Sequence, residues 1–547
     1  MIETRRIFPL LTTALLAATM AFPSAAGRAG AQGLTILDQE GSVAPNGTPS
    51  ATSQIVDVAV GPNNTRVFDP ATVNISVGDT VRWTWGSSFH SVTSGPPCNA
   101  DLQYCSPSDT SCGSGILSNV GAVYTHTFTQ PGTYSYFCAA HCLSSGMTGT
   151  INVAPACTLP PANMVGWFPG DGTARDVAGG NSGRLQGDVT FVAGKVGQAF
   201  RFGGHGDLMG NGDRVVVRNA PELQLQDFTI DAWIKRASAT IVTNDPDSGS
   251  PGGTFFAYGN LGYGFGIFQS TGRLFLTQVG VSAGFSATAV TDTNYHHVAV
   301  TKQGGTVTFY LDGVADAPIS YNPTFVFNTP AGIAARGDNN VQNAFFGDID
   351  ELEIFNRALT AAELQAIVTA GAAGKCKPPQ PAAAFSRKAQ GTGSFDLDLI
   401  PFATAGVECR NPGASGAYQM IVQFPVPVTV TGATILSGIG AVSGFTVNGD
   451  TVTVNLTGVT NAQTLVVNLT GVSDGTSSGN VPVAMGVLIG DTSGNGTVNA
   501  SDVAQTKASS GQPTDAMNFR ADVNLSGMIN ASDIGLVKSK AGTLLPP

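Results

Sequence analysis

Two histidines, a cysteine and a methionine stand in a pattern that suits one metal ion. His90 lies by itself, and Cys138, His141 and Met147 follow together in one short segment. A thiolate and two imidazoles form a trigonal set that favours copper, with a weak thioether on the axis. Because only two residues separate Cys138 from His141, one tight loop can carry both to the same ion. We therefore expect a mononuclear copper site for electron transfer, to which a distant strand contributes His90.

Three other interpretations of these residues have to be weighed. Cys138 could be half of a disulfide and His141 a surface residue, but this leaves His90 and Met147 unexplained. Zinc is a weaker candidate, because one cysteine, two histidines and a methionine make a poor zinc set. The six histidines include no His-x-His pair, so we do not expect the oxygen-reducing cluster of a multicopper oxidase. His126 falls in an alternating strand and is expected to be structural.

The segments that must position these side chains read as short strands with tight turns: Phe68–Val73, Val77–Trp83, Pro131–Cys138 and Gly146–Ile151. Together they resemble the plastocyanin-like cupredoxins over residues 52–154. The resemblance implies an eight-stranded Greek-key sandwich with a blue type 1 copper site at one end. The ligands that it implies are His90, Cys138, His141 and Met147.

This domain departs from the family pattern in two places. The spacing of His141 and Met147 is one residue longer than in the common form of the loop, so Met147 is the ligand to test first. Residues 94–113 read as an insertion that carries Cys98, Cys105 and Cys112. We expect one of these cysteines to form a disulfide with Cys142 and to brace the lengthened loop.

Residues 162–376 resemble a laminin-G-like, concanavalin-type jellyroll. The resemblance rests on these segments: Val165–Gly172, Gly194–Phe202, Phe228–Ile234, Tyr295–Val300 and Gly347–Leu359. Jellyrolls of this kind bind glycans or proteins, often with calcium, and others serve as spacers. A sugar site would need exposed aromatic side chains, for which the sequence offers Phe255, Phe256, Tyr258 and Phe265.

Acidic residues in the jellyroll raise the question of catalysis. Asp348, Asp350 and Glu351 could supply the two carboxylates of a glycosidase, but in the family pattern this run is a structural strand. Asp207 and Asp213 are candidate calcium ligands that the spacing does not establish. We expect no enzymatic activity.

The last segment, 488–547, contains a repeat that follows an Ig-like β sandwich at 382–487. Asp491–Asp502 recurs as Asp522–Asp533, with glycine at the sixth position, where an EF-hand-like calcium loop turns sharply. The expected ligands are Asp491, Ser493, Asn495, Thr497, Asn499 and Asp502 in the first loop, and Asp522, Asn524, Ser526, Met528, Asn530 and Asp533 in the second.

Each loop leads into a short predicted helix, 501–508 and 532–540. The duplicated loop and helix resemble a type I dockerin, a small α unit with an EF-hand pair. The family implies calcium and a cohesin-like partner, although such a repeat can instead close the β domain before it. Asparagine and serine replace several aspartates, so we expect weak binding suited to extracellular calcium. The alternative is a pair of Asn/Gly turns that hold no metal.

Composition agrees with a mainly β, multidomain chain. The 547 residues include 69 glycines and 31 prolines, and only 12% are charged. This mixture is typical of short strands and tight turns. The net charge of −11 argues against nucleic acid and anionic membranes as partners. An apolar run followed by small residues predicts an export signal over 1–31, with twin-arginine export as an alternative route, and no later stretch is long enough to span a membrane.

Export permits disulfides. If Cys138 binds the metal, seven of the eight cysteines remain, and at least one of them stays unpaired. Cys157 and Cys376 flank the jellyroll and are expected to join its ends. Cys409 is then left over.

These observations favour a secreted copper protein for electron transfer, with an unknown redox partner and with binding or placement modules attached. The alternative is a calcium-dependent glycan-binding or adhesion protein of the extracellular space, periplasm or cell surface, in which the copper domain is accessory. A polysaccharide hydrolase would rest on the dockerin-like tail alone.

Overall fold

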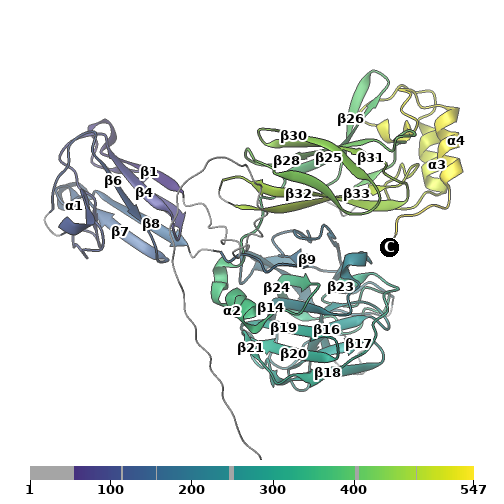
Figure 1. The fold of residues 1–547 in the computed structure, drawn as a ribbon, viewed down its shortest axis with the longest axis horizontal. Coiled ribbons are helices and arrows are strands. Elements are labelled where there is room, and N and C mark those ends of the chain that lie inside the picture. Colours follow the sequence, from purple (N-terminus) through teal and green to yellow (C-terminus); the bar gives the residue numbers. More distant parts are fainter. Residues whose placement is uncertain are drawn as a thin grey trace, which may run out of the picture. The chain divides into compact units, whose positions relative to one another are not determined.

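The computed structural model describes residues 54–112, 115–154, 157–207, 209–245, 252–400, 406–475 and 477–546. The predicted export signal, 1–31, lies outside the described residues. The chain is built mainly from strands, with a few short helices (Figure 1). The expectation of a mainly β, multidomain protein is confirmed.

The N-terminal domain is a sandwich of two sheets, with strand orders β2-β1-β4-β6 and β3-β8-β7-β5. Alternating apolar residues such as Val81 and Trp83 in β4 point into its core. Its elements are β1 Ile55–Val60, β2 Phe68–Asp69, β3 Thr72–Ser76, β4 Thr80–Trp85, β5 Thr93–Ser94, β6 Val123–Thr127, β7 Gly132–Phe137, α1 Cys142–Ser145 and β8 Thr148–Ala154.

The second domain is a jellyroll of two large sheets around an aromatic core. One sheet has the order β10-β13-β23-β15-β16-β17-β18, and the other has β11-β12-β24-β14-β19-β20-β21, with β9 added to β24 and β22 to β20. The elements are β9 Met164–Phe168, β10 Arg184–Gln186, β11 Thr190–Ala193, β12 Gln198–Gly203, β13 Arg214–Val217, β14 Phe228–Arg236, β15 Gly252–Ala257, β16 Tyr263–Phe268, β17 Arg273–Gln278, β18 Ser282–Ala289, β19 Tyr295–Gln303, β20 Thr306–Leu311, β21 Val314–Ala315, β22 Ile319–Ser320, β23 Ala331–Ile333, β24 Phe346–Phe355 and α2 Ala361–Ala370.

Helix α2 begins with a capping box at Thr360. The side chain of Thr360 accepts a hydrogen bond from the backbone of Glu363, whose carboxylate accepts one in return from the backbone of Thr360. This capping box satisfies two N–H groups that would otherwise lack partners. The disulfide between Cys157 and Cys376 joins the two ends of the jellyroll, as expected.

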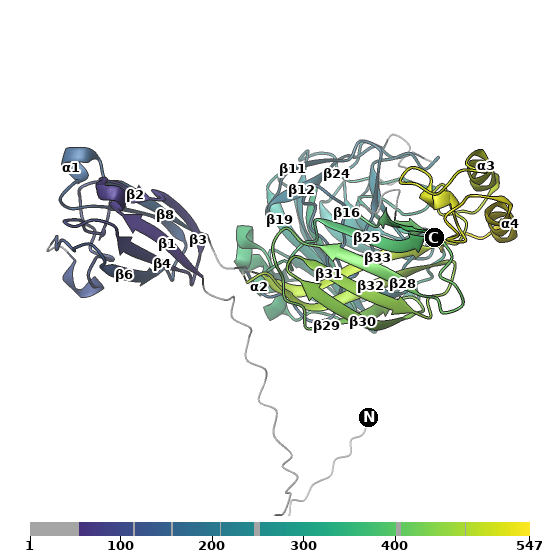
Figure 2. The same cartoon turned by 90° about the horizontal axis from the view of Figure 1, so that it is seen from above.

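The third domain is a sandwich with strand orders β26-β25-β28-β31-β30 and β27-β33-β32-β29, and several of its strands lie side by side in Figure 2. Its strands are β25 Ala383–Gln390, β26 Gly393–Asp398, β27 Val407–Glu408, β28 Tyr418–Gln423, β29 Gly432–Ser437, β30 Ala441–Asn448, β31 Thr451–Thr457, β32 Gln463–Ser473 and β33 Ser478–Val487. The hairpin turn between β30 and β31 follows Asn448, with Gly449 at a φ of 62°.

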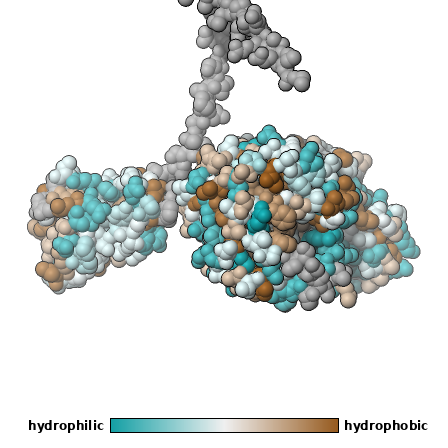
Figure 3. Space-filling view, turned by 90° about the horizontal axis from the view of Figure 1, so that it is seen from below, coloured by the Kyte–Doolittle hydropathy of each residue, from teal (hydrophilic) through white to brown (hydrophobic). Residues whose placement is uncertain are grey.

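Two helices close the chain, α3 Ala500–Ala508 and α4 Ala531–Lys540. Both begin with an asparagine cap and an aspartate three residues later, Asn499 with Asp502 and Asn530 with Asp533. In the part of the chain that the structure describes, no helix combines the length and apolar character needed to cross a bilayer. Figure 3 shows one face of the surface, on which hydrophobic residues lie in small groups among hydrophilic ones.

Candidate metal centre

Two imidazole nitrogen atoms and one thiol sulfur atom, from separate parts of the N-terminal domain, form a compact triangle. Cys138 Sγ lies 3.8 Å from His90 Nδ1 and 3.4 Å from His141 Nδ1, and the two Nδ1 atoms are 3.1 Å apart. A point equidistant from all three lies about 2.0 Å from each. Bonds of a first-row metal such as zinc measure about 2.0–2.1 Å to imidazole and about 2.3 Å to thiolate. The triangle therefore has the size of a three-ligand metal site.

The sandwich brings these side chains together from two segments. His90 follows β4 and forms a bridge with Ser118, while Cys138 directly follows β7 and His141 immediately precedes α1. The loop after Cys138 closes on itself, since the Cys138 N–H donates to the Met147 carbonyl at 3.1 Å and the His141 N–H donates to the Cys138 carbonyl at 3.1 Å. The local backbone therefore fixes the spacing of the two loop ligands.

Ser87 and Gly61 determine which nitrogen of His90 faces the triangle. The Ser87 hydroxyl donates to the Gly61 carbonyl at 2.6 Å, and its oxygen lies 3.1 Å from His90 Nε2. Since the hydroxyl proton is already used, Nε2 must carry a proton and donate, which leaves the Nδ1 lone pair for a metal. A Cβ at Gly61 would lie only 2.5 Å from His90 Nε2, so no side chain fits there. Sequence reasoning missed both residues.

The thiol of Cys138 is buried and is not part of a disulfide. The Ser91 N–H points at its sulfur at 3.4 Å, and the Ser91 hydroxyl accepts a hydrogen bond from the Ala139 N–H at 2.8 Å. Burial lowers the pKa of His90, and the charges of His141 and Arg66 lower it further. Burial and Arg66 likewise lower the pKa of His141. These shifts favour neutral imidazoles, the form that binds metals.

Met147 is packed in the domain core, with only 1% of its surface exposed. It directly precedes β8 and follows Gly146, which ends α1 with a φ of 66°. A buried thioether at the end of the ligand loop suits the weak axial position of a copper site. The assignment of Met147 as a ligand stays a prediction.

The triangle opens to solvent on one side. A cavity of about 440 Å³ beside it is lined by His90, His141, Phe89, Val120 and Arg66, among others. Phe89 and Leu143 are strongly exposed, at 68% and 92% of their surface. The apolar side chains of Phe89 and Val120 therefore border the open side of the triangle next to His90 and His141.

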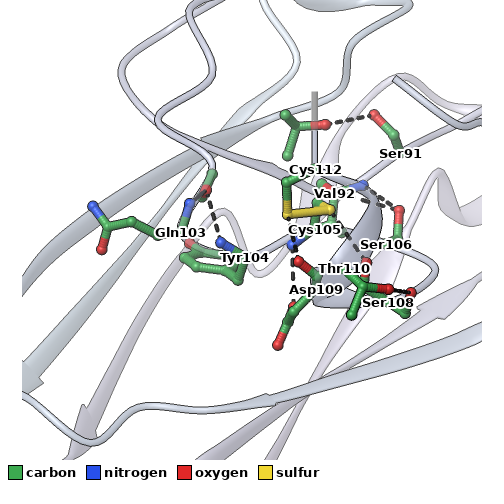
Figure 4. Close-up of a disulfide and its surroundings, with 12 residues drawn as sticks. Ser91, Val92, Gln103, Tyr104, Cys105, Ser106, Ser108, Asp109, Thr110 and Cys112 are labelled. Atoms are coloured by element: carbon green, nitrogen blue, oxygen red, sulfur yellow. Dashed lines mark hydrogen bonds between the residues drawn. A yellow bond between two sulfur atoms is a disulfide. The ribbon is translucent and has the colours of Figure 1, made fainter. Parts of the chain in front are cut away.

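Two disulfides involve the predicted insertion at 94–113, and one of them reaches the site. Cys98 forms a disulfide with Cys142, next to the predicted ligand His141, which matches the expected bracing of the loop. Cys105 forms a second disulfide with Cys112. Figure 4 shows the second bridge, where the Cys105 N–H donates to the Asp109 carboxylate at 3.2 Å. The insertion is thereby joined to the loop that carries His141 at one point and closed on itself at another.

The two EF-hand-like loops near the C-terminus, Asp491–Asp502 and Asp522–Asp533, also have side chains that suit a metal ion. Asp491, Asp502, Asp522 and Asp533 are fully buried, and among the described residues none of them has a lysine or arginine within ion-pair distance. Buried carboxylates normally need a cation. Burial raises the pKa of Asp491, and the charge of Asp502 raises it further. Burial and the charge of Asp522 do the same for Asp533. The first and last positions of both loops are thus suited to calcium.

Between the first and last positions of each loop, backbone N–H groups donate hydrogen bonds to the carboxylate of the first aspartate. Asp491 accepts from the N–H groups of Gly494, Asn495 and Gly496 at 2.8–3.1 Å. Asp522 accepts from those of Ser526 and Gly527 at 3.0 and 2.9 Å. The remaining predicted ligands, Ser493, Thr497, Asn499, Asn524, Met528 and Asn530, lie in the same two loops, and their role as ligands stays a prediction.

In the jellyroll, two of the β24 carboxylates considered for catalysis, Asp348 and Glu351, contact side chains outside β24. Asp348 forms an ion pair with Arg201 at 2.7 Å. Glu351 accepts from the Trp167 indole at 2.9 Å and pairs with Lys377 at 2.7 Å. Asp207 and Asp213 also accept hydrogen bonds from neighbouring groups, Asn211 at 2.7 Å and Asp188 at 2.8 Å. These contacts engage Asp348, Glu351, Asp207 and Asp213 with groups of the protein itself.

The four aromatic side chains that could have formed a sugar platform are core residues. Phe255, Phe256, Tyr258 and Phe265 are all fully buried. They pack against one another and against residues such as Phe345 and Tyr263. None of these four can stack on a ligand at the surface.

Three family models match separate parts of the chain. The model of copper-binding proteins of the plastocyanin/azurin family matches residues 56–154. The model of the concanavalin A-like lectin/glucanases superfamily matches 209–365, and that of the dockerin type I domain matches 489–540.

Two similar proteins match the copper-site domain. A plastocyanin of Scenedesmus fuscus is 35% identical over 91 residues, which are 16% of this chain and 86% of that protein. Halocyanin of Natronomonas pharaonis is 31% identical over 102 residues, 18% of this chain and 56% of halocyanin. Solved structures include a purple cupredoxin from Nitrosopumilus maritimus, with 24% identity, a TM-score of 0.15 and coverage of 18% of this chain and 99% of that one.

Another solved structure is domain 4 of an extracellular arabinanase from Geobacillus stearothermophilus, in complex with arabinotriose, with 16% identity, a TM-score of 0.30 and coverage of 37% of this chain and 97% of that one. The copper-site domain carries the family match. The matched range, 56–154, includes the ligand triangle. The chain therefore belongs to the plastocyanin/azurin family of copper-binding proteins, to which it adds a concanavalin-like and a dockerin-like domain.

Proposed function

We propose that this chain is a secreted electron carrier with one blue copper ion, held by His90, Cys138 and His141 with Met147 on the axis. The observation that carries the proposal is the triangle of Nδ1, Nδ1 and Sγ atoms, which has the size of a metal site before any metal is present. Copper bound there supplies one-electron chemistry. Burial lowers the pKa of both imidazoles, which favours their neutral form. Ser87 orients His90, and the Cys138 thiol is buried.

A spectroscopic titration tests this function. Cu(II) is added to the exported protein, and the visible and electron paramagnetic resonance spectra are recorded. An intense blue thiolate band at one copper per chain is expected, and it should vanish in Cys138→Ser. Cys409→Ser is the matched control, since Cys409 is the other unpaired cysteine among the described residues. A colourless protein that retains no stoichiometric copper would contradict the proposal.

The attached domains support placement outside the cytoplasm. Three disulfides join described cysteines, and such bonds persist in oxidising compartments. Laminin-G-like and dockerin-like modules are typical of extracellular proteins. We propose that these modules hold the copper domain at an extracellular site and that they catalyse no reaction.

A second candidate function is calcium-dependent binding of a glycan or cell-surface protein by the jellyroll. The match to the concanavalin A-like superfamily favours it. A glycan array with the full chain, with calcium and with chelator, tests this role. Calcium-dependent signals that persist in Cys138→Ser would establish binding that does not depend on copper, whereas an empty array would remove glycans as ligands.

A further inference from the structure

The C-terminal repeat and the third domain meet through their backbones. In the turn between β25 and β26, the Gly391 N–H donates to the Leu525 carbonyl of the second calcium loop at 3.3 Å. A Cβ at Gly391 would lie only 2.8 Å from Gly527 Cα. Two glycines therefore allow this hairpin turn to lie directly against the loop, because any side chain would separate them.

A fully buried arginine forms the centre of this contact. The guanidinium of Arg410 donates to Glu408, to the Gln390 side-chain oxygen at 3.1 Å and to the Ser386 carbonyl at 2.9 Å. Its planar face lies 5.2 Å from the ring of Phe519, which belongs to the repeat. Phe519 in turn stacks on Phe395 of β26, with ring centres 5.7 Å apart.

In each predicted calcium loop, a side chain from elsewhere in the chain donates a hydrogen bond to the backbone carbonyl of the first residue. The Gln390 amide, from β25, donates to the carbonyls of Asp522 at 2.9 Å and Phe519 at 2.8 Å. The Arg520 guanidinium donates to the carbonyl of Asp491 at 2.9 Å. Since these aspartates occupy the first ligand position of the two loops, the groups that hold their backbones also set the direction of their carboxylates.

Apolar residues from both sides share one core at this junction. The cluster contains Val407, Leu488, Ile489, Val498, Val523 and Val537. Val407 belongs to β27, whereas Val523 and Val537 belong to the repeat. Burial of these apolar side chains stabilises the folded chain, so the repeat and the third domain are packed against each other.

We infer that the partner of the dockerin-like repeat is the chain's own β sandwich, and that calcium in the second loop stabilises the β25–β26 hairpin through Gln390. The inference rests on the proposed calcium sites and is independent of the copper function. Gln390 acts as a positioning residue, because it reaches the ligand Asp522 through the backbone and touches no metal. Residues 382–547 then form a single calcium-dependent folding unit.

Hydrogen exchange of the full chain, followed by mass spectrometry of its peptides, tests the coupling. With calcium at one hundred times its dissociation constant, exchange limited by opening of the whole unit should slow by about 100-fold relative to chelator for each calcium loop that is filled. The slowing should appear both in the repeat and in peptides covering 383–398. Peptides of the jellyroll strand β14 serve as the internal reference and should not respond.

Variants distinguish coupling between the repeat and the β25–β26 hairpin from simple unfolding of either part. Gln390→Ala should weaken calcium binding about tenfold, as removal of a group that orients a metal ligand does. Phe519→Leu removes the ring stack but no hydrogen-bonding side chain, and should reduce the calcium response at 383–398. Gln419→Ala is the matched control, because Gln419 lies on the neighbouring β28 and its amide donates to Asn455.

Two results would overturn the inference. Calcium could slow exchange in the repeat while leaving 383–398 unchanged, which would make the repeat a separate domain that is free for another partner. Alternatively, calcium could change exchange in neither region. Both results leave the blue copper titration unaffected, so failure here is distinguishable from failure of the proposed electron-transfer function.

Discussion

The hydroxyl oxygen of Ser87 lies 3.1 Å from Nε2 of His90, and the same hydroxyl donates to the Gly61 carbonyl. This pair fixes the tautomer and orientation of one metal ligand before any metal binds. The first prediction follows directly: Ser87→Ala removes the acceptor, and copper affinity should fall about 10- to 100-fold. Competition with a copper chelator measures the change.

Ser88→Ala is the control for that variant. The Ser88 hydroxyl accepts a hydrogen bond from the Val120 N–H at 3.1 Å and does not contact His90. Copper affinity equal to wild type in both variants would show that Ser87 does not position the ligand.

Met147→Leu tests the axial ligand. Leucine retains most of the side-chain volume in the buried site, so the domain should fold with a cost below about 1.5 kcal/mol. If Met147 is the axial ligand, copper should still bind to the other three residues, but the reduction potential should rise because the oxidised ion loses a donor. Voltammetry of the copper-loaded protein gives the result, with Met164→Leu in the jellyroll as the control. An unchanged potential and unchanged resonance spectrum would exclude Met147 as a ligand.

The Cys98–Cys142 disulfide should stabilise the copper loop. Its two cysteines are 44 residues apart, and replacing both with serine should destabilise the domain by about 2–4 kcal/mol. Because Cys142 adjoins His141, the blue band should also be lost at lower urea concentration. The double variant at Cys105 and Cys112, which are only 7 residues apart, should have a smaller effect on the band. Equal loss in both variants would contradict a specific role for the bridge beside His141.

A buried carboxylate should make the jellyroll sensitive to alkaline pH. Burial and the charge of Glu351 raise the pKa of Asp350 to about 8, from an ordinary value of 3.8. Its stabilising effect is therefore fully present below about pH 4 and declines as the pH rises through about 8. Between pH 6 and pH 8 the expected loss is on the order of 2–3 kcal/mol.

Asp350→Asn removes the ionisation and should flatten this pH dependence. Hydrogen exchange of peptides covering β14 and β24 in the full chain, measured at several pH values and corrected for the intrinsic rate, reports the stability. If the variant and the wild type lose protection in parallel as the pH rises, another group is responsible.

The local chemistry of the copper site is visible in the sequence because three of its residues are close together. Cys138, His141 and Met147 lie in one loop, where spacing alone limits the geometry. The duplicated Asp491 and Asp522 loops are visible for the same reason, since an EF-hand-like turn is a local structure. The strand alternation and the helix caps at Thr360, Asn499 and Asn530 also depend on neighbours in the chain.

The sequence by itself thus determined a mainly β chain with a metal-binding pattern and a repeated acidic loop. Only the tertiary structure decided how distant residues meet. It placed Ser87 and Gly61 behind His90, paired Cys98 with Cys142, buried the aromatic residues from Phe255 to Phe265, and brought Gln390 to the carbonyl of Asp522. Such contacts depend on which strands pair and which faces pack, and these long-range choices have no signature in residues that are adjacent in sequence.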